Sequence, residues 1–252
     1  MATPKSDTAN LLNYLYNNLS DHWWTVGMRA TAHTILGNNT STNGTILEVG
    51  CGNGAYLCEL SEKYISGTTI GMDINTQALG HAKNIENIQG SLLQGNFHHL
   101  PLATNSVALS VGLDAFDQTH ANLKIALSEI FRTLIKDGLL LIRVSAHPWL
   151  LGQHDQSFGT GRRYTKNEIC EGITKAGFQI ERFTYANSIM LLPAIITRMA
   201  INLRLVAVEN QFETPNILNL LLTKILLLEA SLLKWINLPT GLSIYILARK
   251  PK

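Results

Sequence analysis

The sequence predicts an α/β fold in which a mostly parallel sheet is covered by helices on both faces. Apolar, strand-like runs alternate with segments of helical spacing between residues 45 and 144. One of these runs, residues 46–49, leads directly into three alternating glycines, Gly50, Gly52 and Gly54. Because crossovers between parallel strands are right-handed, the alternation also limits the topologies that the chain can adopt.

The composition indicates one well-buried domain with an insertion. A chain of 252 residues that is 46% apolar is long enough for a single large core. The formal net charge of +2 gives no field suited to a polyanion, so we expect no nucleic-acid partner. Cys51, Cys58 and Cys170 form no C-x-x-C pair, which favours a reducing compartment. No signal peptide is recognisable, so we expect a cytoplasmic protein.

The elements follow in order from the N-terminus. Helical spacing extends over residues 10–36, and a polar loop precedes the first strand. After the fifth strand, residues 145–165 are rich in Gly, His and Pro and are expected to form a loop beyond the carboxyl edge of the sheet, where substrate binds in such folds. The predicted organisation is a helical segment at 1–44, a core at 45–185, a helical insertion at 186–240 and a last strand at 241–252.

The insertion has mainly helical spacing, with two helices expected at residues 191–208 and 216–236 and a break near residues 213–216. It is interpreted as a cap over the substrate side, and the alternatives are an extension of the core or peripheral membrane contact through Leu-rich faces. The longest apolar tract, residues 217–236, is interrupted by Lys224, Glu229 and Lys234. A membrane-spanning helix is therefore not expected.

The glycine turn is suited to hold a ligand, because residues without a Cβ let the backbone turn tightly and leave N–H groups accessible. Asp73 ends the next predicted strand, where an acid suits a ribose diol. The spacing of Gly50, Gly52 and Ala55 also satisfies a loose dinucleotide fingerprint. Glu48 favours a different ligand, because its carboxylate would repel a pyrophosphate and attract an ammonium group. The pattern favours S-adenosylmethionine over a nicotinamide dinucleotide.

These residues fit the motif E/D-x-G-x-G-x-G, and the sequence resembles the class I S-adenosylmethionine-dependent methyltransferases, in particular the type 11-like group that acts on small molecules. The resemblance continues through residues 94–102, 105–118, 129–142, 177–180 and 243–250. It implies a Rossmann-like, doubly wound, seven-stranded sheet with an antiparallel last strand and a helical cap. It also implies S-adenosylmethionine as the cofactor and residues 45–185 as the domain that binds it.

The resemblance implies a set of cofactor-binding residues. They are Glu48, Gly50, Gly52, Gly54, Asp73, Ile74, Asn96, Phe97 and Asp114. In this family, the first acid and the glycine turn hold the methionine end, and Asp73 takes the ribose hydroxyls. Asn96 stands where many relatives have an Asp that accepts a hydrogen bond from adenine, and an amide oxygen can still accept that bond. Asp114 is expected to face the methyl-transfer site.

Three residues are candidates for a general base, which a hydroxyl or protonated amine acceptor would need: Asp114, His147 and His154. The pair Asp117 and Gln118 replaces a Glu-His pair that is common in relatives, and a solvated acid at Asp117 is the alternative. No metal site is expected, because the histidines do not cluster with thiols or carboxylates at ligand spacing.

A narrower resemblance, to a subgroup with an "H-D…H-x-R-R-Y" loop, covers residues 154–164. Thr160 stands in the place of the second histidine of that loop. The remaining polar residues, Asp155, Arg163 and Tyr164 together with His154, are expected either to shape the pocket or to anchor the loop. We favour anchoring, because Arg and Asp often pair for structural reasons.

The expected function is transfer of a methyl group from S-adenosylmethionine to a small, fairly apolar metabolite by direct displacement. Two alternatives remain open. An NAD(P)-dependent Rossmann oxidoreductase is disfavoured by Glu48 and by the lack of a Tyr-x-x-x-Lys pair. A methyltransferase-like binding protein without turnover is compatible with the departures at Asn96, Gln118 and Thr160. The chemical class of the acceptor is not encoded by spacing.

Overall fold

The computed structural model describes residues 20–37, 44–85, 88, 90–152, 155–156, 158–202 and 214–252. Its strands form one seven-stranded sheet in the order β3-β2-β1-β4-β5-β7-β6. Strands β1 to β6 run in the same direction, and β7 is antiparallel to both of its neighbours. The strands are β1 (Thr45–Val49), β2 (Thr68–Asp73), β3 (Gly90–Gln94), β4 (Val107–Leu113), β5 (Leu134–Ser145), β6 (Gln179–Ala186) and β7 (Ser243–Arg249). This confirms the predicted Rossmann-like, doubly wound sheet.

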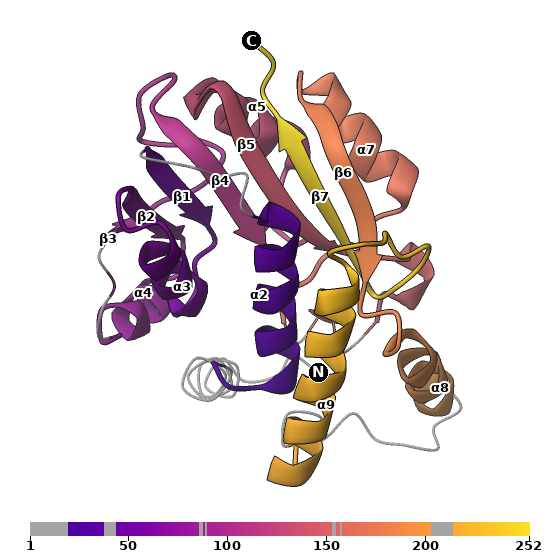
Figure 1. Cartoon of the computed structure of the whole chain (residues 1–252). Coiled ribbons are helices and arrows are strands. Elements are labelled where there is room, and N and C mark those ends of the chain that lie inside the picture. The colour runs from indigo at the N-terminus through magenta and orange to yellow at the C-terminus, as the bar shows by residue number, and fades with distance from the viewer. Residues whose placement is uncertain are drawn as a thin grey trace, which may run out of the picture.

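Helices cover both faces of this sheet (Figure 1). The described helices are α2 (Trp23–Leu36), α3 (Ala55–Lys63), α4 (Thr76–Ala82), α5 (Leu123–Thr133), α7 (Lys166–Lys175), α8 (Leu191–Asn202) and α9 (Asn216–Leu232), with a 3-10 turn η1 at Pro148–Leu150. One core cluster joins α5 and α7 to the sheet, and the other joins α2, α3 and the end of α9 to the opposite face. Since both faces are covered, the central strands are almost continuously apolar.

Helices α2 and α9 lie side by side, although they are far apart in the sequence (Figure 1). A Cβ atom on Gly27 of α2 would lie 2.5 Å from Cδ1 of Leu226, so glycine allows this close approach. The Asn219 side chain of α9 accepts a hydrogen bond from the N–H of Trp23 at 2.8 Å. The predicted helix over residues 10–36 is thus observed from Trp23 onward, and residues 10–19 lie outside the described residues.

The two helices predicted between the sixth and the last strand are present as α8 and α9. Of the predicted break at residues 213–216, only residue 213 lies outside the described residues, and α9 begins at Asn216, directly after Pro215. Leu233, at the C-terminal end of α9, is fully buried in the core cluster beneath α2 and α3. Helix α9 is therefore anchored in the core at this end, while the division of the chain into core and cap remains a prediction. No helix within the described ranges is long and apolar enough to cross a membrane.

The sheet order places a crevice between the carboxyl ends of β1 and β4. From β1 the chain continues to β2 on one side, and β4 continues to β5 on the other. Ligands of doubly wound sheets bind at such a reversal of strand order. Glu48 of β1 pairs in register with Gly71 and Val111, so it sits in the middle of the sheet near this point. The glycine turn after β1 and Asp114 after β4 flank the same crevice.

Candidate functional site

The glycine turn between β1 and α3 is folded as a close cradle. Gly50, Gly52 and Gly54 have φ values of 71°, 54° and 81°, a left-handed region that costs other residues free energy. The N–H groups of Gly50 and Cys51 both donate to the carbonyl oxygen of Met72, at 2.7 and 3.0 Å. A Cβ on Gly50 would lie 2.9 Å from Cβ of Ala115. The turn is thus held against β2 and the end of β4.

Asp73, at the end of β2, has both carboxylate oxygens oriented by backbone donors. Its Oδ2 accepts from the N–H of Gly52 at 2.9 Å, and its Oδ1 accepts from the N–H of Asn75 at 2.8 Å. Each oxygen keeps a further lone pair, so the carboxylate can still accept hydrogen bonds from a diol. Ile74 beside it is 50% exposed, and this places an apolar surface at the lip of the cradle.

Glu48 is the least satisfied charged group of the cradle. It is 3% exposed, and its Oε2 is buried without a hydrogen-bond partner among the described residues. Burial raises the pKa of the Glu48 carboxyl well above its ordinary value, and the charges of Asp73 and Glu59 raise it further, while Arg29 opposes them. Because a buried polar atom without a partner costs about 1–3 kcal/mol, this oxygen is suited to receive a cationic donor.

Arg29 is the cation whose charge lowers the pKa of Glu48, but its side chain is hydrogen-bonded to other groups. Its Nε donates to Glu59 at 2.7 Å, and its Nη2 donates to the carbonyl of Ser20 at 2.9 Å. Glu59 also contacts Nε2 of His33 at 2.9 Å. The hydroxyl of Tyr56, like Glu48 Oε2, is buried without a partner in the described part of the chain. The cradle therefore retains unused hydrogen-bonding capacity.

The loop after β3 carries the residues expected near adenine. Phe97 is 6% exposed, and its ring centroid lies 5.8 Å from that of Phe116 and 5.9 Å from that of His120. Asn96 is exposed, and its Oδ1 accepts from the N–H of His98 at 2.9 Å. The amide oxygen thus shapes the turn and keeps one lone pair for a ligand.

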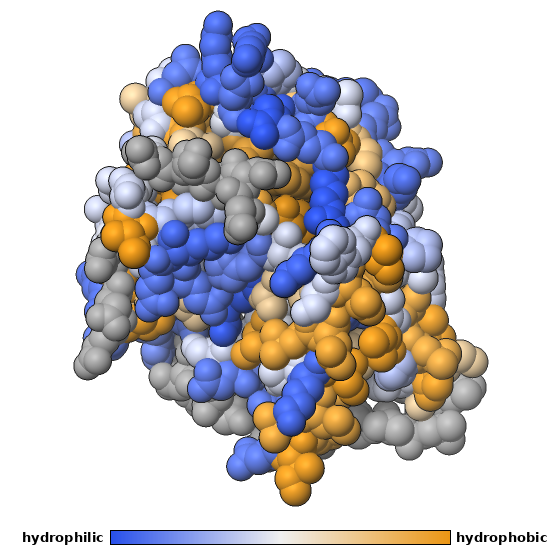
Figure 2. All heavy atoms as spheres, in the orientation of Figure 1, coloured by the Kyte–Doolittle hydropathy of each residue, from blue (hydrophilic) through white to orange (hydrophobic). Residues whose placement is uncertain are grey.

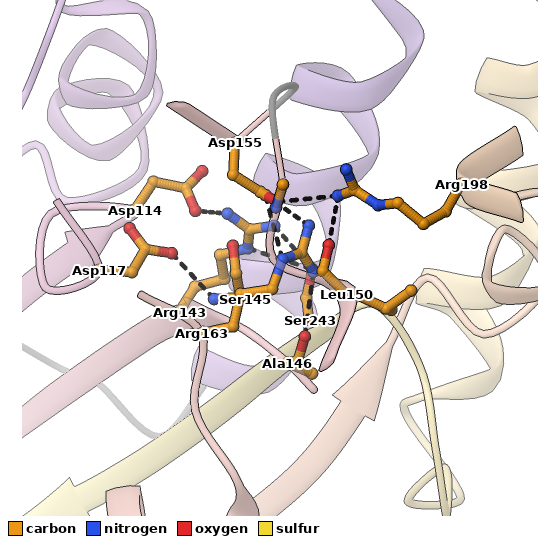
Figure 3. Close-up of polar contacts among 11 residues, drawn as sticks. Asp114, Asp117, Arg143, Ser145, Ala146, Leu150, Asp155, Arg163, Arg198 and Ser243 are labelled. Atoms are coloured by element: carbon orange, nitrogen blue, oxygen red, sulfur yellow. Dashed lines mark hydrogen bonds and ion pairs between the residues drawn. The ribbon is translucent and has the colours of Figure 1, made fainter. Parts of the chain in front are cut away.

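Asp114 follows β4 with φ of 62° and forms an ion pair with Nη1 of Arg143. Figure 3 shows its carboxylate directed at that guanidinium. Arg143 is 3% exposed, donates to Oγ of Ser243 at 2.8 Å and lies 5.5 Å from the ring of Trp24. Burial lowers the pKa of Arg143 to about 10. Asp114 therefore follows the fourth strand with its carboxylate engaged by a cation, and its place at the methyl-transfer site stays a prediction.

Sequence reasoning missed Arg143. The available signal was a lone Arg within the apolar run of residues 139–144, in a strand expected to be buried. A buried guanidinium needs an anionic partner, and the acid at the end of a neighbouring strand is the nearest choice. In the structure, β4 and β5 are parallel neighbours and Leu113 pairs in register with Arg143, which brings Asp114 beside the guanidinium.

Asp117 is fully buried, so the alternative of a solvated acid at this position is wrong. Its Oδ2 accepts from the N–H of Ser145 at 2.9 Å, while its Oδ1 has no partner among the described residues. Burial raises the pKa of Asp117 to about 6, although the Ser145 hydrogen bond and Arg163 oppose this. The next residue, Gln118, lies opposite Thr160 in an isolated bridge, so two of the positions that depart from the family pattern are neighbours.

The loop after β5 is anchored by a group of ion pairs (Figure 3). Asp155 is 4% exposed and accepts from Arg163 at 2.6 Å and from Arg198 of α8 at 3.1 Å. The hydroxyl of Tyr164 donates to the carbonyl of Phe116 at 2.8 Å. These bonds fix the loop to β4, β5 and α8, as in the anchoring interpretation. His154 lies outside the described residues.

His147 stands at the start of this loop, half-buried, with φ of 62°. Its ring stacks on that of Tyr185, with centroids 5.6 Å apart and an interplanar angle of 6°. Its Nε2 lies 3.3 Å from Oγ1 of Thr240. Burial lowers the pKa of His147, and Arg163 lowers it further, while a backbone hydrogen bond with Gly241 opposes them. The imidazole is therefore neutral near pH 7 and able to take a proton.

No group of three His, Cys, Asp or Glu side chains suited to a metal ion is found within the described ranges. All three cysteines lie in those ranges and none forms a disulfide, and burial raises the pKa of each thiol. A raised thiol pKa disfavours the reactive thiolate. The geometry therefore gives no support to a cysteine nucleophile at these three positions.

Residues 47–142 match the family model of a methyltransferase domain. No curated protein matches the chain. A chain of the complex between the Haloferax volcanii Trm112 methyltransferase activator and its methyltransferase is similar, with a TM-score of 0.63 and 17% identity over 96% of this chain and 98% of that chain.

Two further solved structures are methyltransferases with bound ligands. Phosphoethanolamine N-methyltransferase 2 of Haemonchus contortus with S-adenosyl-L-methionine has a TM-score of 0.57 and 15% identity, covering 85% of this chain and 50% of that chain. Geranyl diphosphate C-methyltransferase of Streptomyces coelicolor with S-adenosyl-L-homocysteine has a TM-score of 0.59 and 13% identity, covering 88% and 79%. At these identities the structures establish the fold. The chain therefore combines a region that matches a methyltransferase domain with a fold that it shares with solved methyltransferases.

Proposed function

We propose that the protein is an active methyltransferase that transfers the methyl group of S-adenosylmethionine to a small, fairly apolar metabolite. The observation that carries the proposal is the buried carboxylate of Glu48, whose Oε2 has no partner in the described part of the chain and lies behind a left-handed glycine turn. An ammonium group at this place would offset the cost of burying the charge. A pyrophosphate would add to that cost.

The residues of the cradle fit the cofactor group by group. Glu48 and the turn from Gly50 to Gly54 would hold the methionine end, and Asp73 would hold the ribose hydroxyls. Ile74 and Phe97 would flank the adenine, and Asn96 would accept from its amine. When bound, the cofactor supplies a methyl group already activated by the sulfonium. The protein then has to align the acceptor and exclude water.

His147 is proposed as the general base for a hydroxyl or protonated amine acceptor. Its lowered pKa keeps it neutral at pH 7, and Tyr185 and Thr240 hold its ring in place. Asp114 is proposed to position the site rather than to take the proton, because Arg143 engages its carboxylate. His154 remains a second candidate base. A carbon acceptor would need neither histidine.

An apolar acceptor is favoured by the side chains around the loop after β5. Trp149 is 63% exposed and Leu151 is 40% exposed next to His147. The charged groups of the same loop are already paired, as Asp155 is with Arg163 and Arg198. A charged acceptor would find few free partners there, whereas an apolar one can bury these exposed surfaces.

The test measures release of S-adenosylhomocysteine by the full chain, with S-adenosylmethionine and a panel of apolar hydroxyl, amine and carbon acceptors. We expect saturable cofactor binding by calorimetry and turnover with at least one acceptor class. For a hydroxyl or amine acceptor, His147→Gln is expected to lower kcat about a hundredfold or more. The control His99→Gln changes an exposed imidazole on the loop after β3 and is expected to leave kcat unchanged.

Two outcomes contradict the proposal. If a nicotinamide dinucleotide binds and S-adenosylmethionine does not, the protein is an oxidoreductase of the dinucleotide type. If S-adenosylmethionine binds but no S-adenosylhomocysteine is released in the presence of a whole extract of candidate acceptors, the protein is a binding protein without turnover.

A further inference from the structure

Helix α9 presents an apolar stripe to solvent along its whole length. We define the α9 stripe as Ile217, Leu221, Lys224, Leu228 and Leu232, which follow the three- and four-residue spacing of one helix face, together with Trp235 in the turn after α9. Ile217 is 87% exposed, Leu228 is 67% exposed and Trp235 is 86% exposed. Figure 2 shows the apolar side chains of this region gathered over α9 and the neighbouring α8. Soluble monomers rarely leave so continuous an apolar surface open, so the stripe indicates a binding surface.

The opposite face of α9 packs against the protein core. Leu226, Ala230 and Leu233 are nearly fully buried and follow the same helical spacing. The core side of the helix is therefore satisfied without any residue of the α9 stripe. Helix α8 repeats the pattern, since Leu192, Ile196 and Met199 are 64%, 58% and 58% exposed. The open apolar surface is thus shared by two helices.

Among the described residues of α8, α9 and the turn after α9, the exposed charges all have one sign. Lys224 lies within the α9 stripe, and Lys234 follows the helix, and both are exposed. The single acid of α9, Glu229, is 4% exposed and turned inward, where it accepts from the N–H of Ile189 at 3.2 Å and from that of Asn187. Arg198 of α8 is paired with Asp155. Exposed apolar residues flanked by lysines, with a Trp at one end, are typical of a helix that lies in a lipid interface.

A second copy of the chain fits this charge pattern poorly. In a two-fold symmetric contact the same patch occurs on both partners. The lysines of one α9 stripe would face those of the other, and the described residues of α8 and α9 offer no exposed acid to neutralise them. Headgroups of an anionic bilayer provide the missing charge, and the lysine stems can extend to reach them while the apolar residues insert.

We propose that the α9 stripe, with the apolar face of α8, docks the protein on the surface of an anionic phospholipid bilayer. Arg198 links α8 to the carbonyl of Leu150, so the loop that carries the exposed Trp149 and Leu151 lies beside the docking helices. The inference goes beyond the proposed function and does not depend on the identity of the acceptor. It concerns binding, and its test needs no turnover.

The test is cosedimentation of the full chain with two kinds of vesicles: phosphatidylcholine alone, and phosphatidylcholine mixed with phosphatidylserine. We expect binding to the mixed vesicles that weakens as salt is raised. Leu228→Glu is expected to weaken partitioning about tenfold or more, because it places a carboxylate where an apolar group inserts. Lys224→Glu is expected to weaken it by a similar factor, and only with phosphatidylserine present.

Matched controls separate docking from a general loss of exposed apolar or basic groups. Ile65 is 78% exposed in the turn after α3, so Ile65→Glu makes the same change away from the α9 stripe. Lys124 is exposed on α5, so Lys124→Glu controls for charge. Both controls are expected to bind mixed vesicles as the wild type does. All four substituted positions are exposed, so loss of folding is not expected, and the unfolding midpoint of each variant checks this.

Three results would overturn the inference. In the first, the wild type remains in the supernatant with both kinds of vesicles. In the second, Ile65→Glu weakens binding as strongly as Leu228→Glu. In the third, the wild type is a dimer that Leu228→Glu converts to a monomer, with no vesicle binding, and the surface then belongs to a second copy. None of these results affects cofactor binding, so this inference and the proposed function fail independently.

Discussion

The cofactor side and the acceptor side of the crevice differ in how their buried charges are paired. On the cofactor side, Glu48 Oε2 and the Tyr56 hydroxyl are buried without partners among the described residues. On the acceptor side, Asp114 is paired with Arg143, and Asp155 is paired with both Arg163 and Arg198. The cofactor side leaves a charge for a ligand to satisfy, whereas the acceptor side pairs these charges within the protein, with Asp117 Oδ1, buried without a partner among the described residues, as an exception.

This difference separates two kinds of recognition. A free buried carboxylate selects a cationic ligand, because only a cation offsets its desolvation. Ion pairs formed within the protein do not select a ligand by its charge. They instead hold the backbone of the acceptor loop in place. We therefore expect substitutions on the acceptor side to change the stability of the fold, and substitutions on the cofactor side to change ligand affinity.

The largest expected effect on stability comes from breaking the ion pair beneath the acceptor side. Arg143→Met removes a buried cation and leaves the Asp114 carboxylate without its ion-pair partner, while Ser243 keeps its hydrogen bond from Asn187. Breaking a buried pair costs about 3–5 kcal/mol, and we expect the lower end because the Asp114 side chain is 32% exposed. Unfolding in urea measures the loss. The exposed pair of Lys175 and Glu171 provides the control, because Lys175→Met is expected to cost less than about 1 kcal/mol. Equal losses would show that Arg143 is not a structural anchor.

The second effect concerns Asp117 and has a defined dependence on pH. Its pKa is about 6 in the folded protein and 3.8 ordinarily, so between these values the folded state holds a proton that the unfolded state has released. The free energy of unfolding therefore falls as the pH rises through this window, by on the order of 2–3 kcal/mol. Asp117→Asn is expected to flatten this fall, while Asp137→Asn, at a more exposed acid, leaves it in place. An unchanged slope in Asp117→Asn would mean that Asp117 stays ionised throughout.

A smaller effect is expected from the cofactor cradle. Gly50→Ala puts a side chain at φ of 71° and 2.9 Å from Cβ of Ala115, which costs at least about 1–2 kcal/mol. Gly80 lies in α4 with no atom within 4 Å of an added Cβ, so Gly80→Ala is expected to stabilise the protein by about 0.5–1 kcal/mol. Thermal unfolding compares the two. The account of the turn fails if both substitutions stabilise the protein.

The cofactor side was accessible from the sequence because its geometry is local. Glu48, the glycines and Asp73 lie within one strand-turn-helix-strand unit, and residue spacing alone brings them together. The seven-stranded sheet followed from the alternation of strands and helices and from the family resemblance. That Glu48 Oε2 has no hydrogen-bond partner among the described residues could be learned only from the structure, because it depends on which groups Arg29 contacts.

The acceptor side was less accessible because its contacts are long-range. Arg143 meets Ser243 across 100 positions of the sequence, and Arg198 reaches Asp155 from a separate helix. No spacing rule predicts such pairs. The burial of Asp117 could not be predicted for the same reason, because an acid in a polar segment of the sequence is expected to be exposed. The exposure of the α9 stripe likewise followed from the packing of Leu226 and Leu233 against the core.

The measurement that tests the central claim most directly is calorimetric titration of S-adenosylhomocysteine into the wild type, Glu48→Gln and Glu62→Gln. Because glutamine keeps the shape and removes the buried charge, the fold of Glu48→Gln is expected to persist. Losing a charge-assisted hydrogen bond is expected to weaken affinity about tenfold to a hundredfold, whereas Glu62→Gln, at an exposed acid on α3, binds as the wild type does.

The titration is repeated as the pH is raised. Because the pKa of Glu48 is raised, its ionised fraction grows with pH, so the affinity of the wild type is expected to increase and that of Glu48→Gln to stay flat. If Glu48→Gln binds S-adenosylhomocysteine as tightly as the wild type at every pH, the buried carboxylate is not the partner of the cofactor, and the account is contradicted.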